Sequence, residues 1–386
     1  MNKITSALLV ALLLVLGACG DDGGDMAAED VDDATTGGGD GGDTVSTTAG
    51  DDGTAADDRA DGATDPDREE VTIRLLTHDS FTLSDGIFDQ FADDTGITVD
   101  VVAGGDAGEI VARAILTAGA PEADVLFGID NTFLQRGLDA ELFEPYESPG
   151  LESVPGELVL DDQHRVTPID YGDVCLNYWT DAVPGGTPPG SMDDLTRPEY
   201  AATFVTQDPE TSSPGFAFFL ATVAAYGPDG WEGYWQQLAD GGVTVTSGWE
   251  DAYYGEFVAG GGDKSIVTSY ASSPVAEVVF ADPPVDAAPT GVVLDSCFRQ
   301  IEFAGILAGT EHPEAAAQLI DFMLSETFQE DIPLNMFVAP ANAEAEIPAV
   351  YTDNAPVPTR TLSLTPEEIE ANRADWTERW AEIVLR

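Results

Sequence analysis

The sequence has 386 residues and is strongly acidic: 72 aspartate and glutamate residues against 14 lysine and arginine residues give a formal net charge of -58 at pH 7. A chain with so few cationic side chains is excluded from nucleic-acid binding as its main function. Acidic surfaces stay soluble in high salt and attract cations, and the charge alone does not separate salt adaptation from cation binding.

The first segment of the chain has the pattern of an export signal. Lys3 precedes an apolar run, residues 7–16, that is too short to span a membrane. The run ends in Leu16-Gly17-Ala18-Cys19, which resembles a bacterial lipoprotein box. That resemblance implies a signal peptide over residues 1–18, cleavage before Cys19, and a lipid on its thiol that anchors the mature chain to the cell membrane. An ordinary signal peptide that happens to contain a cysteine is the alternative.

Residues 19–70 are rich in Asp, Gly, Thr and Ala and have almost no aromatic or large aliphatic side chains. Such a segment buries too little apolar surface to offset its loss of conformational entropy, so we expect disorder. Its like charges repel one another and extend it. We interpret it as an acidic tether between the membrane and a folded domain.

Residues 71–386 are too many for one small core and predict two lobes. Alternating strands and helices in the first lobe indicate an open α/β sheet. The predicted strands are residues 71–77, 97–103 and 124–128, and the predicted helices are residues 87–95, 109–119 and one that Asp130 opens. Ligands of such sheets lie beyond the carboxyl ends of the strands. The loops expected there carry His78, Asp79, Ser80, Asp106 and Asp130.

Two apolar, β-rich stretches, residues 167–179 and 292–301, predict strands that cross between the lobes beside a ligand cleft. Asp170 and Tyr171 lie in the first of them. Cys175 and Cys297 lie on the two proposed strands, and an even pair of cysteines in an exported chain predicts a disulfide. This bond would staple the hinge.

The second lobe repeats the pattern of strands followed by polar or aromatic loops. Its predicted strands are residues 202–206, 243–246 and 265–269, and its helices are residues 216–226 and 231–239. The loops carry Ser212, Ser213, Trp249, Tyr253, Tyr270 and Ser272. Helices are also predicted at residues 313–324 and 365–385. We place lobe 1 at about residues 71–170 and 297–340, and lobe 2 at about residues 175–295.

These loops predict a binding site without catalytic machinery. Aromatic faces beside carboxylates suit a flat organic cation. Ser212, Ser213 and the backbone amides of residues 104–108 suit a phosphate or another anionic tail. Each candidate has a structural alternative: Asp106 and Asp130 are equally typical helix caps, and Trp249 and Tyr270 could be core aromatics. The three histidines have no metal-binding spacing and no G-x-S-x-G motif occurs, so we expect no enzyme activity, metal or cofactor.

Several segments together resemble the extracytoplasmic thiamine-binding proteins of bacterial ABC importers. They are T-H-D-S-F at residues 77–81, A-D-V-L-F-G-I-D-N at 123–131, I-D-Y-G at 169–172, Q-D-P-E-T-S-S-P-G-F at 207–216, V-T-V-T-S-G-W-E-D-A-Y at 243–253, S-Y-A-S-S-P at 269–274, F-M-L-S-E-T-F-Q-E-D-I-P at 322–333 and T-P-E-E-I-E from residue 365. Their order and spacing hold over nearly the whole folded part.

The resemblance implies a two-lobed α/β periplasmic binding protein fold of type II-like architecture, with two open sheets joined by crossing strands. It also implies closure on thiamine or its mono- or diphosphate and delivery to a permease with its ATPase. Trp249 should stack on the ligand with Tyr270 beside it, and Asp79, Ser80, Asp106 and Ser212 should contact it, the last two on the phosphate side. This chain departs from the family pattern at His78 and Ala276, where tyrosines are expected. It also lacks a tryptophan in residues 82–86 and has Met336 or Phe337 at the position of a late aromatic.

We therefore expect a monomeric thiamine-binding lipoprotein outside the cell membrane. A ferric-ion-binding protein, which would need Tyr253, Tyr254 and Tyr270 to converge, is one alternative. A polyamine-binding protein and a lipoprotein that signals its ligand to a kinase are two others.

Overall fold

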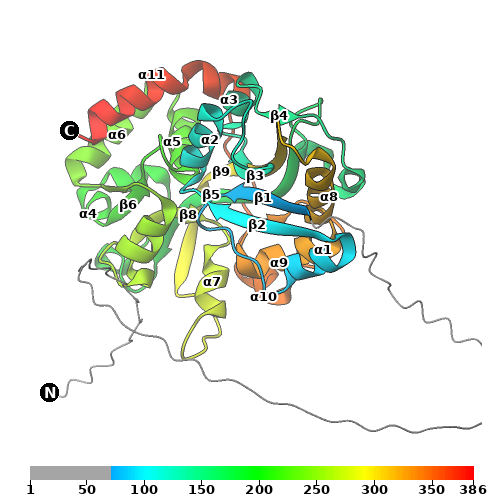
Figure 1. Ribbon diagram of the computed structural model, residues 1–386. Coiled ribbons are helices and arrows are strands. Elements are labelled where there is room, and N and C mark those ends of the chain that lie inside the picture. The colour runs from blue at the N-terminus through cyan, green and yellow to red at the C-terminus, as the bar shows by residue number, and fades with distance from the viewer. Residues whose placement is uncertain (1–70) are drawn as a thin grey trace, which may run out of the picture. The chain divides into compact units, whose positions relative to one another are not determined.

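A ten-stranded mixed sheet runs through residues 71–386, the part of the chain that the computed structural model describes (Figure 1). Neighbouring strands follow the order β2 (Ile97–Ala103), β1 (Val71–Thr77), β3 (Val125–Asp130), β9 (Thr290–Leu307), β5 (Thr167–Trp179), β8 (Ile266–Tyr270), β6 (Phe204–Gln207) and β7 (Thr244–Thr246). The short strands β4 (Phe143–Glu144) and β10 (Ala339–Pro340) pair with β9 and β5. The predicted signal peptide, Cys19 and the tether lie outside the described residues.

The long strands β5 and β9 divide the sheet into two parallel parts. We call β1, β2 and β3, with the loops and helices that follow them, the first half, and β6, β7 and β8, with the loops and helices that follow them, the second half. Pairing is parallel within each half, whereas β9 runs antiparallel to β3 and to β5, and β5 antiparallel to β8. The predicted architecture of two α/β parts joined by crossing strands is confirmed.

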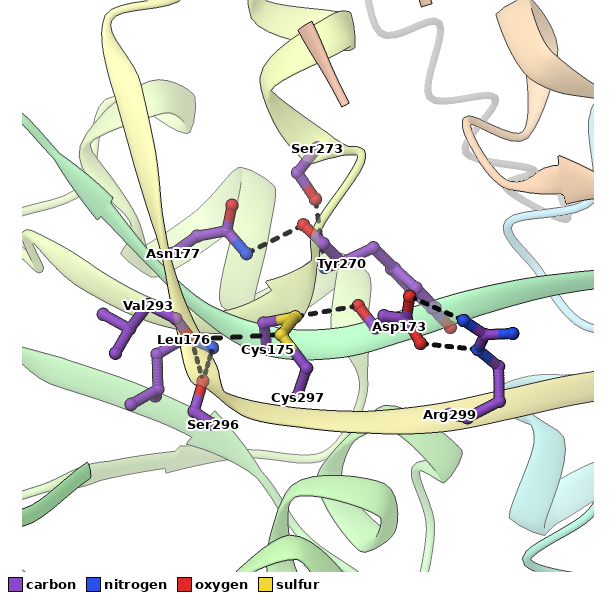
Figure 2. The surroundings of a disulfide bond; sticks show 10 residues. All are labelled: Asp173, Cys175, Leu176, Asn177, Tyr270, Ser273, Val293, Ser296, Cys297 and Arg299. Carbon is purple, nitrogen blue, oxygen red and sulfur yellow. Dashed lines mark hydrogen bonds and ion pairs between the residues drawn. A yellow bond between two sulfur atoms is a disulfide. The ribbon is translucent and has the colours of Figure 1, made fainter. Parts of the chain in front are cut away.

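A break in the pairing of β5 with β9 lies at the middle of the sheet (Figure 2). Val174 pairs with Phe298, but Leu176 pairs with Val293, so residues 294–297 bulge out of β9. The hydroxyl of Ser296 fills the gap, because it accepts the Leu176 N–H at 2.9 Å. The predicted disulfide is present at this break, where Cys175 on β5 is bonded to a buried Cys297 on β9.

Helices cover the sheet, and the most buried of them is α5 (Ser213–Tyr226). Every residue of α5 from Ser213 to Val223 is buried, as expected of a helix that is apolar all round. Its aromatic side chains pack against α6 (Trp231–Gly241) and against α11 (Pro366–Val384). Helix α11 packs along α6 and also reaches α3 (Leu134–Asp139), so it spans both halves (Figure 1).

Each of the remaining helices covers only a small part of the sheet. They are α1 (Ile87–Thr95), α2 (Ala107–Leu116), α4 (Pro198–Ala201), α7 (Ser273–Val279), α8 (Pro313–Met323), α9 (Glu326–Asn335) and α10 (Ala349–Asn354). Strands β1, β2 and β5 and helix α1 have the predicted bounds, whereas three predicted helix starts were wrong. Helix α5 begins at Ser213 and not at residue 216, because Ser212 caps it. Helix α2 begins at Ala107 because Asp106 caps it, and α3 begins at Leu134 because Asp130 forms a turn that precedes the helix. Among the described helices, none is both long and apolar enough to cross a membrane.

Candidate functional site

A pocket lies between the two halves, beyond the carboxyl ends of β1, β2, β7 and β8. Its cavity volume is about 200 Å³. Its walls combine acidic, aromatic and hydroxyl side chains. The predicted residues among them are His78, Asp79, Ser80, Asp106, Ser213, Trp249, Tyr253 and Tyr270, and further lining residues include Glu109, Glu250, Asp251, Tyr254, Glu302, Met336 and Phe337.

The Asp106 carboxylate joins the two halves at the pocket wall. It caps α2, where its Oδ1 accepts the Ala107 N–H at 2.7 Å. The same carboxylate accepts two N–H groups of the second half, from Ser213 at 3.2 Å and from Trp249 at 3.1 Å. Burial raises the pKa of Asp106, although the backbone hydrogen bonds oppose this shift. Asp106 is therefore a helix cap that also lines the pocket, and its contact with a ligand stays a prediction.

The two halves approach each other closely beside this carboxylate. The Gly108 N–H in the first half donates to the Thr211 carbonyl in the second half at 3.1 Å. A Cβ atom at position 108 would lie 2.6 Å from that carbonyl oxygen. Ser80 adds a weak contact to Glu250 at 3.5 Å. The two halves are therefore in direct contact at one side of the pocket.

An aromatic wall, Trp249 with Tyr253 and Tyr254, forms one side of the pocket. The Trp249 and Tyr253 rings are stacked, with centroids 5.0 Å apart and planes 20° apart. The indole Nε1 donates to Ser269 at 2.9 Å, which fixes the ring orientation. Tyr253 is buried and Tyr254 is exposed, since a π-helical turn over Asp251–Glu256 points the two neighbours in different directions. The wall thus has a rigid centre and a solvent-facing edge.

Tyr270 stands apart from that wall, at the end of β8. Its hydroxyl donates to Gln300 Oε1 at 2.8 Å, and Gln300 in turn donates to the Ser213 hydroxyl at 2.7 Å and to Asp130. The Tyr270 N–H donates to the Ser273 hydroxyl, as Figure 2 shows. The phenol is thus held by residues of both halves and of β9.

A buried acidic cluster lies at the base of the pocket. His78 Nε2 is 3.8 Å from Glu302 Oε1. Burial disfavours the imidazolium, yet the Glu302 carboxylate, together with Asp106 and Asp79, raises the pKa of His78 above its ordinary value. Behind them, Asp170 is fully buried, and no hydrogen-bond donor among the described residues contacts its carboxyl oxygens. Burial and the neighbouring Glu302 raise the pKa of Asp170 well above its ordinary value, so this carboxyl is favoured in its neutral form.

Five predicted contact residues do not line the pocket: Asp130, Asp170, Tyr171, Ser212 and Ser272. Asp130 is buried below it, where its carboxylate accepts from Thr132, and burial raises its pKa to about 6. Ser212 caps α5 by accepting the Gly215 N–H. Ser272 donates to the Phe337 carbonyl, and Tyr171 packs under the Arg299 guanidinium. In this structure these side chains support the pocket from outside.

Glu302, Glu109 and Glu250 are lining residues that the sequence analysis missed. Glu302 lies inside a continuous buried strand, and the sequence shows nothing of its approach to His78 from β9. Glu109 had a readable signal, because an acidic residue three positions after Asp106 forms a capping box with it.

Comparison with known proteins gives a family and several relatives of this chain. The model of a family described as "Bacterial extracellular solute-binding protein" matches residues 120–360. The thiamine-binding periplasmic protein of Escherichia coli (strain K12) is 30% identical over 81% of this chain and 94% of its own length. The protein of the same name from Brucella suis biovar 1 (strain 1330) is 29% identical over 82% of this chain and 92% of its own.

Solved structures show the same fold. A structure described as a periplasmic thiamin binding protein aligns with a TM-score of 0.73 and 28% identity, covering 82% of this chain and 96% of that one. A ferric binding protein from Campylobacter jejuni aligns with a TM-score of 0.67 at 16% identity, over 81% of this chain and 99% of that one. The latter likeness concerns the fold alone.

Proposed function

Because the chain belongs to the bacterial extracellular solute-binding protein family, we propose that it captures thiamine outside the cell membrane and delivers it to an ABC importer. One observation carries the proposal: a stacked Trp249–Tyr253 pair and several carboxylates line one pocket between the two halves. An aromatic face and nearby carboxylates both stabilise a planar cation such as a thiazolium, and exclusion of water strengthens these contacts. The similarity to thiamine-binding proteins over 81% of the chain supports it further.

In this proposal the protein binds and does not catalyse, and it works as a monomer without a resident cofactor. The permease would recognise the closed arrangement in which Asp106 joins the two halves. The sequence Leu16-Gly17-Ala18-Cys19 supports a lipid anchor at Cys19. Replacement of Cys19 by Ala should then move the protein from the membrane fraction to the soluble fraction, and unchanged membrane association would contradict the anchor.

The tyrosine geometry does not favour ferric-ion binding. Tyr253 donates its hydroxyl hydrogen to Glu277 at 2.6 Å, whereas Tyr270 donates to Gln300, so each phenol is held by a different side chain. Burial, with Glu277 nearby for Tyr253 and Glu302 nearby for Tyr270, raises the pKa of both phenols well above the ordinary value. The phenolates that a ferric ion would bind are therefore disfavoured.

Isothermal titration calorimetry of the full-length protein tests the function. Thiamine should bind one to one and raise the thermal midpoint, whereas spermidine and ferric citrate should give neither effect. Absence of both heat and thermal shift with millimolar thiamine would refute the proposal. Preferential binding of spermidine would establish the polyamine alternative.

A further inference from the structure

We propose that the pocket selects unphosphorylated thiamine and rejects its phosphate esters. This inference rests on the proposed function and adds the form of the vitamin that the site accepts. The donors that would hold a phosphate are occupied, the lining is acidic, and among residues 71–386 no lysine or arginine lines the space.

The backbone amides of residues 104–108 already have acceptors within the protein. Gly104 donates to the Thr77 carbonyl at 3.0 Å and Gly108 to the Thr211 carbonyl at 3.1 Å. Three more amides donate to carboxylates: Gly105 to Asp79 at 2.9 Å, Asp106 to Glu109 at 3.1 Å and Ala107 to Asp106 at 2.7 Å. A glycine-rich turn that leads into a helix would ordinarily attract an anion. Here the protein's own acidic side chains take that place.

The backbone N–H donors at the amino end of α5 also have acceptors within the protein. Its first N–H, from Ser213, donates to the Asp106 carboxylate, and the next residue, Pro214, has no N–H. The Gly215 N–H donates to the Ser212 hydroxyl. Across the pocket the Trp249 N–H also donates to Asp106. A phosphate placed here would have to displace a carboxylate that holds the two halves together.

The charges of the pocket lining oppose a phosphate as well. Six carboxyl side chains line the space: Asp79, Asp106, Glu109, Glu250, Asp251 and Glu302. His78 is the sole basic side chain among the described residues of the lining, and it already lies beside Glu302. Like charges in a partly desolvated site repel strongly, so a dianionic tail is disfavoured where a cation is stabilised.

Competition calorimetry on the full-length protein, with thiamine, thiamine monophosphate and thiamine diphosphate, tests the inference. We expect each ester to bind at least about tenfold more weakly than thiamine, the effect of one unfavourable charge contact. The difference should shrink as salt is raised, because salt screens the exposed part of the repulsion. Equal or tighter binding of either ester would overturn the selectivity while leaving the proposed function intact. A failure of thiamine itself to bind would overturn the proposed function.

Two variants and a matched control locate the cause. Asp106→Asn removes the carboxylate that joins the two halves, and Glu250→Gln removes an exposed carboxylate at the pocket wall. Each variant should therefore reduce the preference for thiamine over an ester, as the ratio of their affinities, by about threefold or more. Asp375→Asn makes the same change of net charge on an exposed residue of α11, which does not line the pocket. It should leave the ratio unchanged. If all three variants narrow the ratio equally, the lining is not the cause and the inference fails.

Discussion

The Asp106 carboxylate of the first half accepts the backbone N–H of Trp249 of the second half at 3.1 Å. This contact ties the cap of α2 to the residue that we place against the ligand. The contact that holds the two halves together therefore also positions the indole.

Replacement of Trp249 by Ala should weaken thiamine binding by about 1–3 kcal/mol, because the variant loses the stacked face that rests on Tyr253. Trp249→Phe keeps an aromatic face but loses the indole hydrogen bond to Ser269, so its affinity should be intermediate. Calorimetry measures both. Unchanged affinity in the alanine variant would remove Trp249 from the site.

Gly108→Ala should weaken thiamine binding by roughly 1–3 kcal/mol, because its methyl group would meet the Thr211 carbonyl oxygen and hold the halves apart. Gly233→Ala is the control, since a Cβ atom at that position of α6 meets nothing within 4 Å. Small-angle scattering with and without thiamine should show a more open Gly108→Ala protein. Normal affinity and unchanged scattering would show that this close approach does not govern closure.

Removal of the disulfide by Cys175→Ala with Cys297→Ala should lower the free energy of unfolding by about 4 kcal/mol, as expected for so long a loop in the chain-entropy model. Urea unfolding measures the loss. Reductant should lower the stability of the wild-type protein toward that of the variant and have no effect on the variant. Equal stability of the two oxidised proteins would mean that the bond does not restrain the hinge.

The free energy of unfolding of the Asp170→Asn variant, relative to the wild type, should increase as pH rises. In the wild-type protein the pKa of Asp170 is raised by burial and by Glu302, so the folded state keeps a proton that the unfolded state releases above about pH 4. The contribution of Asp170 to stability is present at low pH and is lost as pH rises through the folded-state pKa. The variant lacks this loss.

Urea unfolding of both proteins at pH 4, 5.5 and 7 checks the sign. The difference in free energy of unfolding, variant minus wild type, should increase across the series. Asp375→Asn, on the exposed face of α11, should show no such trend. A constant difference for Asp170→Asn would mean that folding does not raise the pKa of this carboxyl.

Local patterns were sufficient to predict the strands and the loops at their ends. The apolar runs at β1, β2 and β5 gave their bounds directly, and the pocket lies at the predicted carboxyl ends of the strands. The cysteine pair predicted the bond between β5 and β9. The strand bounds follow from the composition of a few neighbouring residues, and the disulfide follows from the number of cysteines in an exported chain.

Contacts between distant segments could not be predicted in this way. Glu302 meets His78 across more than two hundred residues of sequence, and nothing near either residue indicates the other. Asp130 and Ser212 have the residue types of ligand contacts, yet their hydrogen bonds serve Thr132 and Gly215. A polar side chain at a strand end or helix start satisfies a ligand or the backbone equally well, and only the tertiary structure decides which.

A crystal structure of the protein with thiamine shows directly whether the ligand lies in this pocket. The account predicts one thiamine molecule between the two halves, with a ring against Trp249 and its positive charge within about 6 Å of the aromatic face and near the Asp79 or Glu302 carboxylate. Thiamine bound on the outer surface, with the pocket between Trp249, Tyr270 and Asp79 filled only by water, would contradict it.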